Sequence, residues 1–215
     1  IATGGLLEEG LRGAGARLFN GRGERYMERY EPQKLERATR DVISRAGYIE
    51  IRAGRGTPSG GVLLDASHLG QEFLLRHFPG MVERCADYGF DLLCGPVEVS
   101  PSAHYQMGGV EIDRDGRTNL EGLFVAGEDS GGVHGANRLG GNGVADSIVF
   151  GARAGDAMAA CAASRQLEAV SDSRIHELVE LWSNPFRRDT GEKAFPLRRR
   201  LEDLMWEKVG IVRDG

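Results

Sequence analysis

The chain has 215 residues, with 27 basic and 32 acidic side chains and a formal net charge of −5 at pH 7. A composition of 40% hydrophobic and 27% charged residues is that of a globular protein, which excludes a disordered chain. The mild acidity argues against a nucleic-acid-binding protein, in which a basic stripe is expected.

The cysteines and histidines do not form a recognisable framework. Cys85, Cys94 and Cys161 lack C-x-x-C spacing, and the five histidines lack an H-E-x-x-H pair. We therefore predict neither a disulfide framework nor a metal site. The sequence also has no apolar run of about 18 residues, so no transmembrane segment is predicted. Because it begins with Ile1 rather than Met, we expect a piece of a longer protein.

Helical spacing dominates the first part of the chain. Residues 34–52 have one apolar face, which predicts a helix over this range and places Arg40 on its solvated side. The pattern then predicts, in chain order, a strand at 62–65, a helix capped by Ser67 that runs to about His77, a helix from Pro79 to Gly89, and a short edge strand at 97–99.

The second part of the chain is rich in glycine. Glycine accounts for 32 of the 215 residues and is densest between 127 and 143. A hairpin is predicted over 109–126, with a buried strand at 122–126. A helix capped by Asn142 is predicted to run to about Ala163, followed by amphipathic helices at 177–182 and 197–206.

A strand, a glycine loop and a helix in succession form an arrangement that favours anions, because the first helical turn has free N–H groups. The loop lacks both G-x-G-x-x-G and a P-loop lysine. On these residues alone, a phosphate cradle and an ordinary surface loop both remain open.

Longer motifs in the sequence are more informative than the glycine loop alone. They are Leu-Glu-Glu-Gly-Leu-Arg-Gly (7–13), Gly-Glu-Arg-Tyr-Met-Glu-Arg-Tyr (23–30), Arg-Asp-Val (40–42), Ser-Ala-His-Tyr-Gln-Met-Gly-Gly (102–109), Gly-Glu (127–128), His-Gly-Ala-Asn-Arg-Leu-Gly-Gly-Asn (134–142) and Met-Trp-Glu-Lys-Val-Gly (205–210). Together they resemble the flavoprotein subunit of succinate dehydrogenase and fumarate reductase, a family that also contains L-aspartate oxidase.

The resemblance implies an α+β fold with three parts. Residues 1–95 would be part of a substrate-capping domain, residues 96–165 the returning half of an FAD-binding α/β domain, and residues 166–215 the start of a helical domain. The family's N-terminal dinucleotide-binding part would lie upstream of Ile1. The implied cofactor is FAD.

Three residues match the family's proton-transfer path. The resemblance implies that Arg40 is the proton donor and acceptor, in the first turn of a helix capped by Thr39, and this overrides its placement on a solvated face. Because the pKa of arginine exceeds about 12, such a role needs a relay that restores its proton. The resemblance assigns this relay to Glu9 and Arg12, whereas the residues alone would also fit a surface salt bridge.

The resemblance also implies ligands for substrate and cofactor. His104 and Arg138 would hold substrate carboxylates, although a core histidine and a structural arginine are the alternatives from the residues alone. The residues implied for FAD are Tyr105, Glu128, Asn142, Gly143 and Val144.

Two residues depart from the family pattern. Glu8 stands where the family has a Thr or Ser that binds a substrate carboxylate, so either Glu8 turns away or the substrate offers a different group there. Gly143 replaces the usual serine near the flavin.

The resemblance thus implies an FAD-dependent oxidoreductase segment that transfers hydride between flavin and a small dicarboxylate. The alternatives are an L-aspartate oxidase, a relative acting on another organic acid, and a catalytically inert fragment. An iron–sulfur subunit is a possible partner, and the implied location is cytoplasmic or on the inner face of a membrane through partner subunits.

Overall fold

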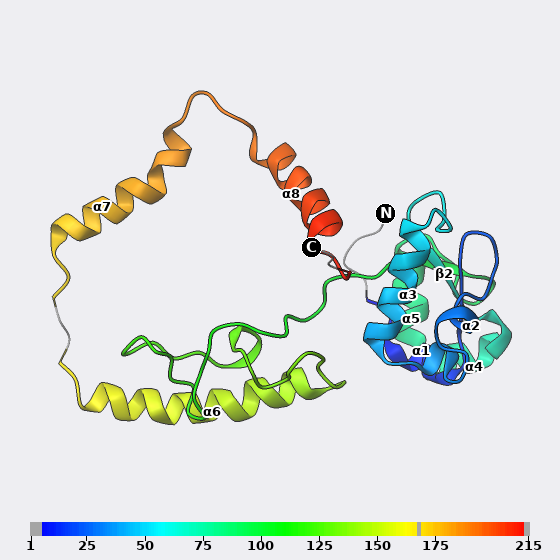
Figure 1. Ribbon diagram of the computed structural model, residues 1–215, viewed down its shortest axis with the longest axis horizontal. Coiled ribbons are helices and arrows are strands. Elements are labelled where there is room, and N and C mark those ends of the chain that lie inside the picture. The colour runs from blue at the N-terminus through cyan, green and yellow to red at the C-terminus, as the bar shows by residue number, and fades with distance from the viewer. Residues whose placement is uncertain (1–5, 167–168, 213–215) are drawn as a thin grey trace. The chain divides into compact units, whose positions relative to one another are not determined.

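The computed structural model describes residues 6–166 and 169–212. The chain divides into two compact units, residues 1–102 with 204–215 and residues 103–203, and each unit has its own architecture (Figure 1). The predicted division at residues 95 and 165 remains a prediction.

The first unit is a small sheet covered by short helices. Its helices are α1 (Glu9–Ala14), α2 (Met27–Tyr30), α3 (Arg40–Arg52), α4 (Gln71–His77) and α5 (Pro79–Asp87), its strands are β1 (Arg17–Phe19), β2 (Val62–Asp65) and β3 (Val97–Val99), and its 3-10 turns are η1 (Leu35–Arg37) and η2 (Ser67–Leu69).

The sheet is antiparallel in the order β1–β2–β3, so β3 is an edge strand as predicted. Leu18 lies opposite Leu64, and Leu64 lies opposite Val97. These three side chains are buried, which places them on the sheet face that the helices cover. Leu11, Met27, Leu74 and Leu92 are fully buried in the same core.

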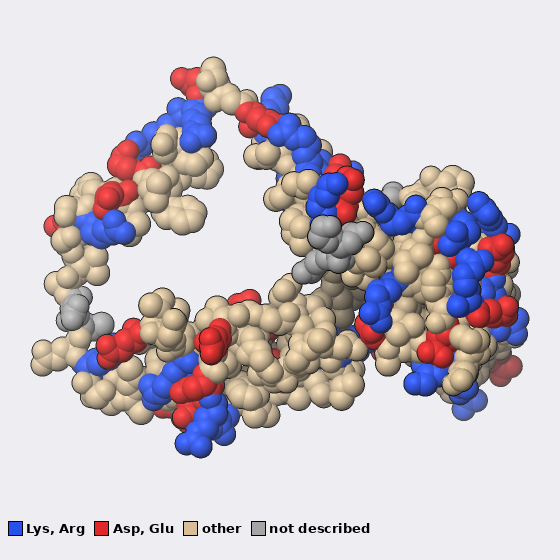
Figure 2. Space-filling view, in the orientation of Figure 1, with Lys and Arg blue, Asp and Glu red and all other residues tan. Residues whose placement is uncertain are grey.

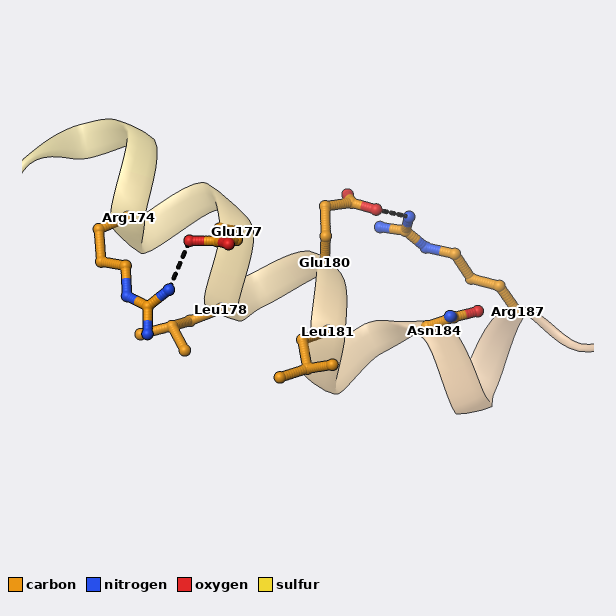
Figure 3. Close-up of a pocket in the computed structure, with 7 residues that line it drawn as sticks. All are labelled: Arg174, Glu177, Leu178, Glu180, Leu181, Asn184 and Arg187. Atoms are coloured by element: carbon orange, nitrogen blue, oxygen red, sulfur yellow. Dashed lines mark hydrogen bonds and ion pairs between the residues drawn. The ribbon is translucent and has the colours of Figure 1, made fainter.

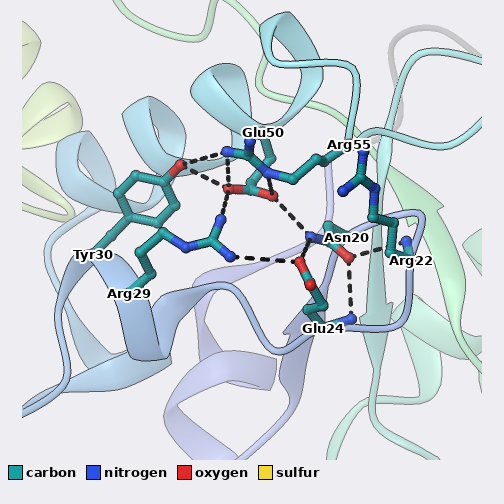
Figure 4. A network of polar contacts seen from close by, with 7 residues as sticks. All are labelled: Asn20, Arg22, Glu24, Arg29, Tyr30, Glu50 and Arg55. Atoms are coloured by element: carbon teal, nitrogen blue, oxygen red, sulfur yellow. Dashed lines mark hydrogen bonds and ion pairs between the residues drawn. The ribbon is translucent and has the colours of Figure 1, made fainter.

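A carboxylate lies at the centre of a polar network in this unit. Glu50, on α3, is fully buried and accepts hydrogen bonds from Asn20 (2.8 Å), Arg29 (2.8 Å), Tyr30 (2.7 Å) and Arg55 (2.8 Å, twice) (Figure 4). Burial by itself raises the pKa of Glu50, but the hydrogen bonds from its partners outweigh burial and lower the pKa to about 2. The network ties the loop around Asn20 and helix α2 to α3.

The predicted continuous helix over 34–52 is wrong. The structure has the short turn η1, then extended backbone at Ala38 and Thr39, and α3 begins only at Arg40. The buried guanidinium of Arg12 explains the break, because its NH1 donates to the carbonyl oxygens of Glu36 (2.7 Å) and Ala38 (3.3 Å). In a continuous helix these two carbonyls would accept from Arg40 and Val42.

Other predicted boundaries also shift. Ser67 does not cap a long helix: η2 occupies 67–69, and α4 starts after Gly70, whose φ of +88° interrupts the helical path. The helix that opens at Pro79 is confirmed as α5.

The second unit is built on a 22-residue helix, α6 (Asn142–Ala163). Its other elements are η3 (Gly127–Asp129), α7 (Asp172–Ser183), η4 (Asn184–Arg187) and most of α8 (Ala194–Lys208). The helices expected around residues 177–182 and 197–206 are therefore confirmed as parts of longer ones. Asn142 is the first residue of α6 rather than its cap, because Gly141 occupies the N-cap in a left-handed conformation.

The predicted hairpin over 109–126 is wrong as a pair of strands. In the described part of the chain this segment has single bridges only, Arg117 with Phe124 and Val110 with Ser130. The turn itself forms, since Asp113 Oδ1 accepts from the backbone N–H groups of Asp115 and Arg117. An Asx-type turn needs only local partners, whereas a strand needs a neighbour along its whole length.

Surface charge is uneven. Acidic and basic side chains mix over the first unit, whereas the surface around the N-terminal half of α6 is almost uncharged (Figure 2). A shallow hollow of about 480 Å³ lies along α7 and η4, between the ion pairs Arg174–Glu177 and Arg187–Glu180 (Figure 3). It contains none of the predicted site residues.

We expect Glu50→Gln to lower the free energy of unfolding by about 3 kcal/mol, because it leaves the Arg29 and Arg55 guanidinium groups without their buried counter-charge. Urea denaturation of the intact protein, followed by circular dichroism, measures the change. Glu28→Gln is the matched control: this carboxylate is exposed on α2, and its loss should change stability by less than about 0.5 kcal/mol.

The effect of Glu50→Gln on the free energy of unfolding should depend on pH. The pKa of Glu50 in the folded protein lies below the ordinary value of 4.5, so ionised Glu50 stabilises the fold fully above that value and loses its contribution as the pH falls towards 2. The stability difference between wild type and Glu50→Gln should therefore shrink between these two pH values. A constant difference would contradict this account of the network.

Candidate active site

Glu9 joins two arginines in the first unit. Its Oε2 lies 2.8 Å from Nε of Arg40, and its Oε1 lies 3.3 Å from NH2 of Arg12. The fold explains the arrangement: α1 places Glu9 and Arg12 one turn apart, and α3 presents Arg40 as its first residue, after Thr39 at the N-cap. The expectation that Arg40 lies in the first turn of a helix capped by Thr39 is confirmed.

The two arginines differ in their surroundings. Arg12 is buried, whereas the Arg40 side chain is 36% exposed. Burial lowers the pKa of the Arg12 guanidinium; the charge of Glu9 opposes this effect and that of Arg40 adds to it. The carboxylate of Glu9 thus lies between a buried and a partly exposed guanidinium.

Among the described residues, Glu8 forms no ion pair with Arg12 or Arg40. It is the N-cap of α1, and its carboxylate folds back over the first turn, so that a Cβ added at Gly10 would lie 2.9 Å from Glu8 Oε1. Its backbone N–H points at Sδ of Met81 (3.4 Å). Within residues 6–166 and 169–212, Glu8 forms no ion pair.

Arg138 and Tyr105 meet in the second unit. The Arg138 guanidinium carbon lies 4.2 Å from the centroid of the Tyr105 ring, a cation–π contact. Tyr105 directly follows His104, whose side chain is exposed. The structure thus places Arg138 against the residue next to His104.

The Tyr105 hydroxyl belongs to a polar cluster that the sequence motifs did not predict. It lies 3.2 Å from Oδ2 of Asp146 and 3.3 Å from Nε2 of His134, and these two atoms are 3.1 Å apart. Burial and the hydrogen bond to Asp146 raise the pKa of Tyr105. One signal in the sequence could have found the cluster: Asp146 is the single charged residue between 142 and 152.

The absence of a side chain at Gly143 has a structural reason. A Cβ at this position would lie 2.8 Å from Cε2 of Tyr105, so the ring occupies the space that a serine would need. The substitution noted in the sequence thus accompanies a close approach of Tyr105 to the start of α6. Val144, the next residue, is 69% exposed.

A groove of about 740 Å³ lies in this unit. Its walls are largely apolar and include Val110, Phe124 and Val125, and Glu128 lines it. Oε1 of Glu128 accepts the backbone N–H of Gln106 (2.8 Å), which fixes the carboxylate at the groove. Asp129 is the second acidic residue that lines the groove.

The comparisons with known proteins agree with these features. Residues 1–144 match the FAD binding domain family. The chain therefore belongs to the FAD binding domain family, and the prediction of FAD as cofactor is confirmed. The resemblance to fumarate reductase flavoproteins and L-aspartate oxidases is confirmed as well.

Two relatives illustrate the similarity. One of the subunits of the fumarate reductase (CoM/CoB) of Methanothermobacter marburgensis is 48% identical over 98% of this chain and 38% of its own length. L-aspartate oxidase 2 of Ralstonia nicotianae is 41% identical over 98% of this chain and 36% of its own length. The chain thus spans little more than a third of these relatives.

Solved structures show the same fold. A quinol–fumarate reductase with menaquinol molecules matches with a TM-score of 0.85 at 36% identity, over 97% of this chain and 39% of that one. Mycobacterium smegmatis Sdh1 in complex with UQ1 matches with a TM-score of 0.79 at 38% identity, over 98% of this chain and 35% of that one. The described part of the chain contains no helix long and apolar enough to cross a membrane.

Gly109 provides a test of the groove. A Cβ at this position would lie 2.2 Å from the carbonyl oxygen of Asp129, so Gly109→Ala must push apart two segments that line the groove. We expect FAD to bind at least about tenfold more weakly to the variant. The ratio of flavin to protein absorbance after gel filtration of the intact protein measures the effect.

Gly155→Ala is the matched control, because Gly155 lies inside α6 with open space around its Cα. We expect it to retain flavin and to be slightly more stable. Full flavin retention by Gly109→Ala would contradict the assignment of the groove.

Proposed function

We propose that this chain supplies the proton-transfer path and one carboxylate ligand of an FAD-dependent oxidoreductase that acts on a small dicarboxylate. The observation that carries the proposal is the contact of Glu9 with both Arg12 and Arg40. A carboxylate that contacts both a buried and a partly exposed arginine can pass a proton between them. An ordinary surface ion pair has no buried partner.

In the reductive direction, the reaction adds a hydride to one carbon of a carbon–carbon double bond and a proton to the other. FAD, when bound, exchanges a hydride with one carbon of the dicarboxylate. Tyr105, Glu128, Asn142, Gly143 and Val144 are the residues proposed to hold it. The neighbouring carbon must gain or lose a proton, and this part of the reaction belongs to the protein.

Arg40 is the proposed proton donor in the reductive direction. Nε of Arg40 contacts Oε2 of Glu9, so a proton that leaves the guanidinium can be replaced through the Glu9 carboxylate. Arg12 holds the other oxygen of Glu9, and its own NH1 is fixed by two backbone carbonyls. Arg12 therefore orients Glu9, and burial lowers the pKa of the Arg12 guanidinium.

Arg138 and His104 are the proposed carboxylate ligands. A guanidinium can form two parallel charge-assisted hydrogen bonds to a carboxylate and so set the orientation of the substrate. Nε of Arg138 is buried and has no hydrogen-bond partner among the described residues.

The fumarate reductases among the relatives are named as subunits of larger enzymes. We extend this to the present protein and propose that its flavin, when bound, would exchange electrons with an iron–sulfur subunit, donating them when reduced and accepting them when oxidised. Its location at a membrane surface would then come from the partner subunits.

The mechanism predicts that Arg40→Lys in the intact protein lowers kcat by about 10²–10⁴-fold, because an ammonium cannot span from Glu9 to the substrate in the same geometry. Flavin content should be unchanged, since Arg40 is proposed to transfer a proton rather than to hold the cofactor. Anaerobic flavin reoxidation by fumarate measures the turnover.

Arg45→Lys is the matched control on the same helix, where Arg45 forms an exposed ion pair with Asp41 (2.9 Å). It should retain turnover. Wild-type turnover by Arg40→Lys would remove Arg40 from the mechanism.

Substitutions of Glu8 test which substrate the protein accepts. If its carboxylate repels a dicarboxylate, Glu8→Thr and Glu8→Gln should each lower KM for fumarate by about tenfold. For a substrate that carries an amine, such as L-aspartate, the same substitutions should raise KM, because Glu8 would attract its positive charge. Steady-state kinetics with both substrates separates the two cases, and no change with either would show that Glu8 faces away from the site.

A further inference from the structure

His134 and Asp146, which contact the Tyr105 hydroxyl, have no role in the chemistry above. Asp146 is only 5% exposed, although its neighbours on α6, Val144 and Ile148, are 69% and 67% exposed. A carboxylate buried on an otherwise exposed helix needs compensating partners. Its Oδ2 has two, His134 and Tyr105, which come from segments outside α6, whereas its Oδ1 is buried without a hydrogen-bond partner among the described residues.

The cluster constrains the Tyr105 ring from three sides. The hydroxyl lies within 3.3 Å of both His134 and Asp146. One ring edge lies against the backbone of Gly143, where a Cβ would be 2.8 Å away. One ring face carries the Arg138 guanidinium at 4.2 Å. The ring is thus a fixed platform between a buried carboxylate and a cation.

This platform also acts electrostatically. A phenol that donates a hydrogen bond to a carboxylate holds more electron density on its ring, and a cation over the ring face is then attracted more strongly. Arg138 itself is otherwise weakly held: NH1 donates to the carbonyl of Leu139 (3.2 Å), and Nε is buried without a partner among the described residues. The ring of Tyr105 therefore provides the main restraint on this guanidinium within the described chain.

We propose that His134 and Asp146 are positioning residues, which fix Tyr105 so that its ring orients Arg138 toward the carboxylate of an organic anion. This rests on the proposed role of Arg138 as a carboxylate ligand. Neither residue touches the anion in this proposal. Gly143 belongs to the same device, since a side chain there would displace the ring.

The test is equilibrium binding of malonate to the intact protein, measured by isothermal titration calorimetry. Malonate has two carboxylates but no adjacent pair of CH₂ groups to oxidise, so binding is read without turnover. We expect Tyr105→Phe and Asp146→Asn each to weaken malonate binding by about tenfold. The two changes combined should also weaken it by about tenfold, since both break one chain of contacts.

Kinetics separates positioning from a merely structural role. Asp146→Asn should raise KM for fumarate by about tenfold and change kcat by less than about twofold, whereas Tyr105→Phe is read by malonate binding alone, because Tyr105 is also proposed to hold FAD. Tyr105→Phe keeps the ring shape, so it remains informative if Asp146→Asn fails to fold. Asp156→Asn is the matched control, because Asp156 lies exposed on the same helix, and it should bind malonate as wild type does.

Measurements in the Arg138→Lys background distinguish the proposed role of Arg138 as a carboxylate ligand from the proposed positioning role of His134 and Asp146. If Arg138→Lys binds malonate like wild type, the role of Arg138 as a carboxylate ligand is wrong. If Arg138→Lys binds weakly and Tyr105→Phe weakens binding by the same factor in both backgrounds, the positioning role is wrong. Loss of the Tyr105→Phe effect in that background supports the positioning role, and unchanged malonate affinity of Tyr105→Phe in the wild-type background overturns it.

Discussion

One buried guanidinium organises the first unit. Arg12 takes the backbone carbonyls of Glu36 and Ala38, which a continuous helix would use for its own hydrogen bonds. The chain must therefore stop one helical segment and start another, and the new helix begins at Arg40. The same guanidinium holds Glu9, so one buried charge both creates the helix start that presents Arg40 and orients the carboxylate that contacts it.

The second unit uses a comparable device with an aromatic ring at its centre. Tyr105 stands between the buried Asp146 and the cation of Arg138, and it approaches the first turn of α6 at a glycine. In both units a polar group withdrawn from solvent holds a second group, which is more exposed and available to a ligand. Burying the supporting group is costly, and this cost is offset only when all its partners are in place.

Much of the chain could be predicted from local patterns. Pro79 at the first position of α5, the strand β2 and the extent of α6 each reflect short-range rules, and the structure follows them. The candidate relay residues were predictable from long motifs in the right order. The helix over 34–52 was not, because its break depends on Arg12, which lies more than twenty residues earlier in the chain. The cluster of His134, Asp146 and Tyr105 escaped prediction for the same reason, since its members are separated by 29 and 12 positions.

The amino-acid sequence alone determined the class of flavoprotein, the cofactor and the identities of the candidate groups, because these depend on which side chains follow one another in recognisable motifs. Only the tertiary structure decided which oxygen of Glu9 faces which arginine, why Gly143 has no side chain, and what supports Tyr105. Such contacts depend on distances between segments remote along the chain. Those distances are set by packing and by the need to satisfy buried polar groups, and neither leaves a local pattern.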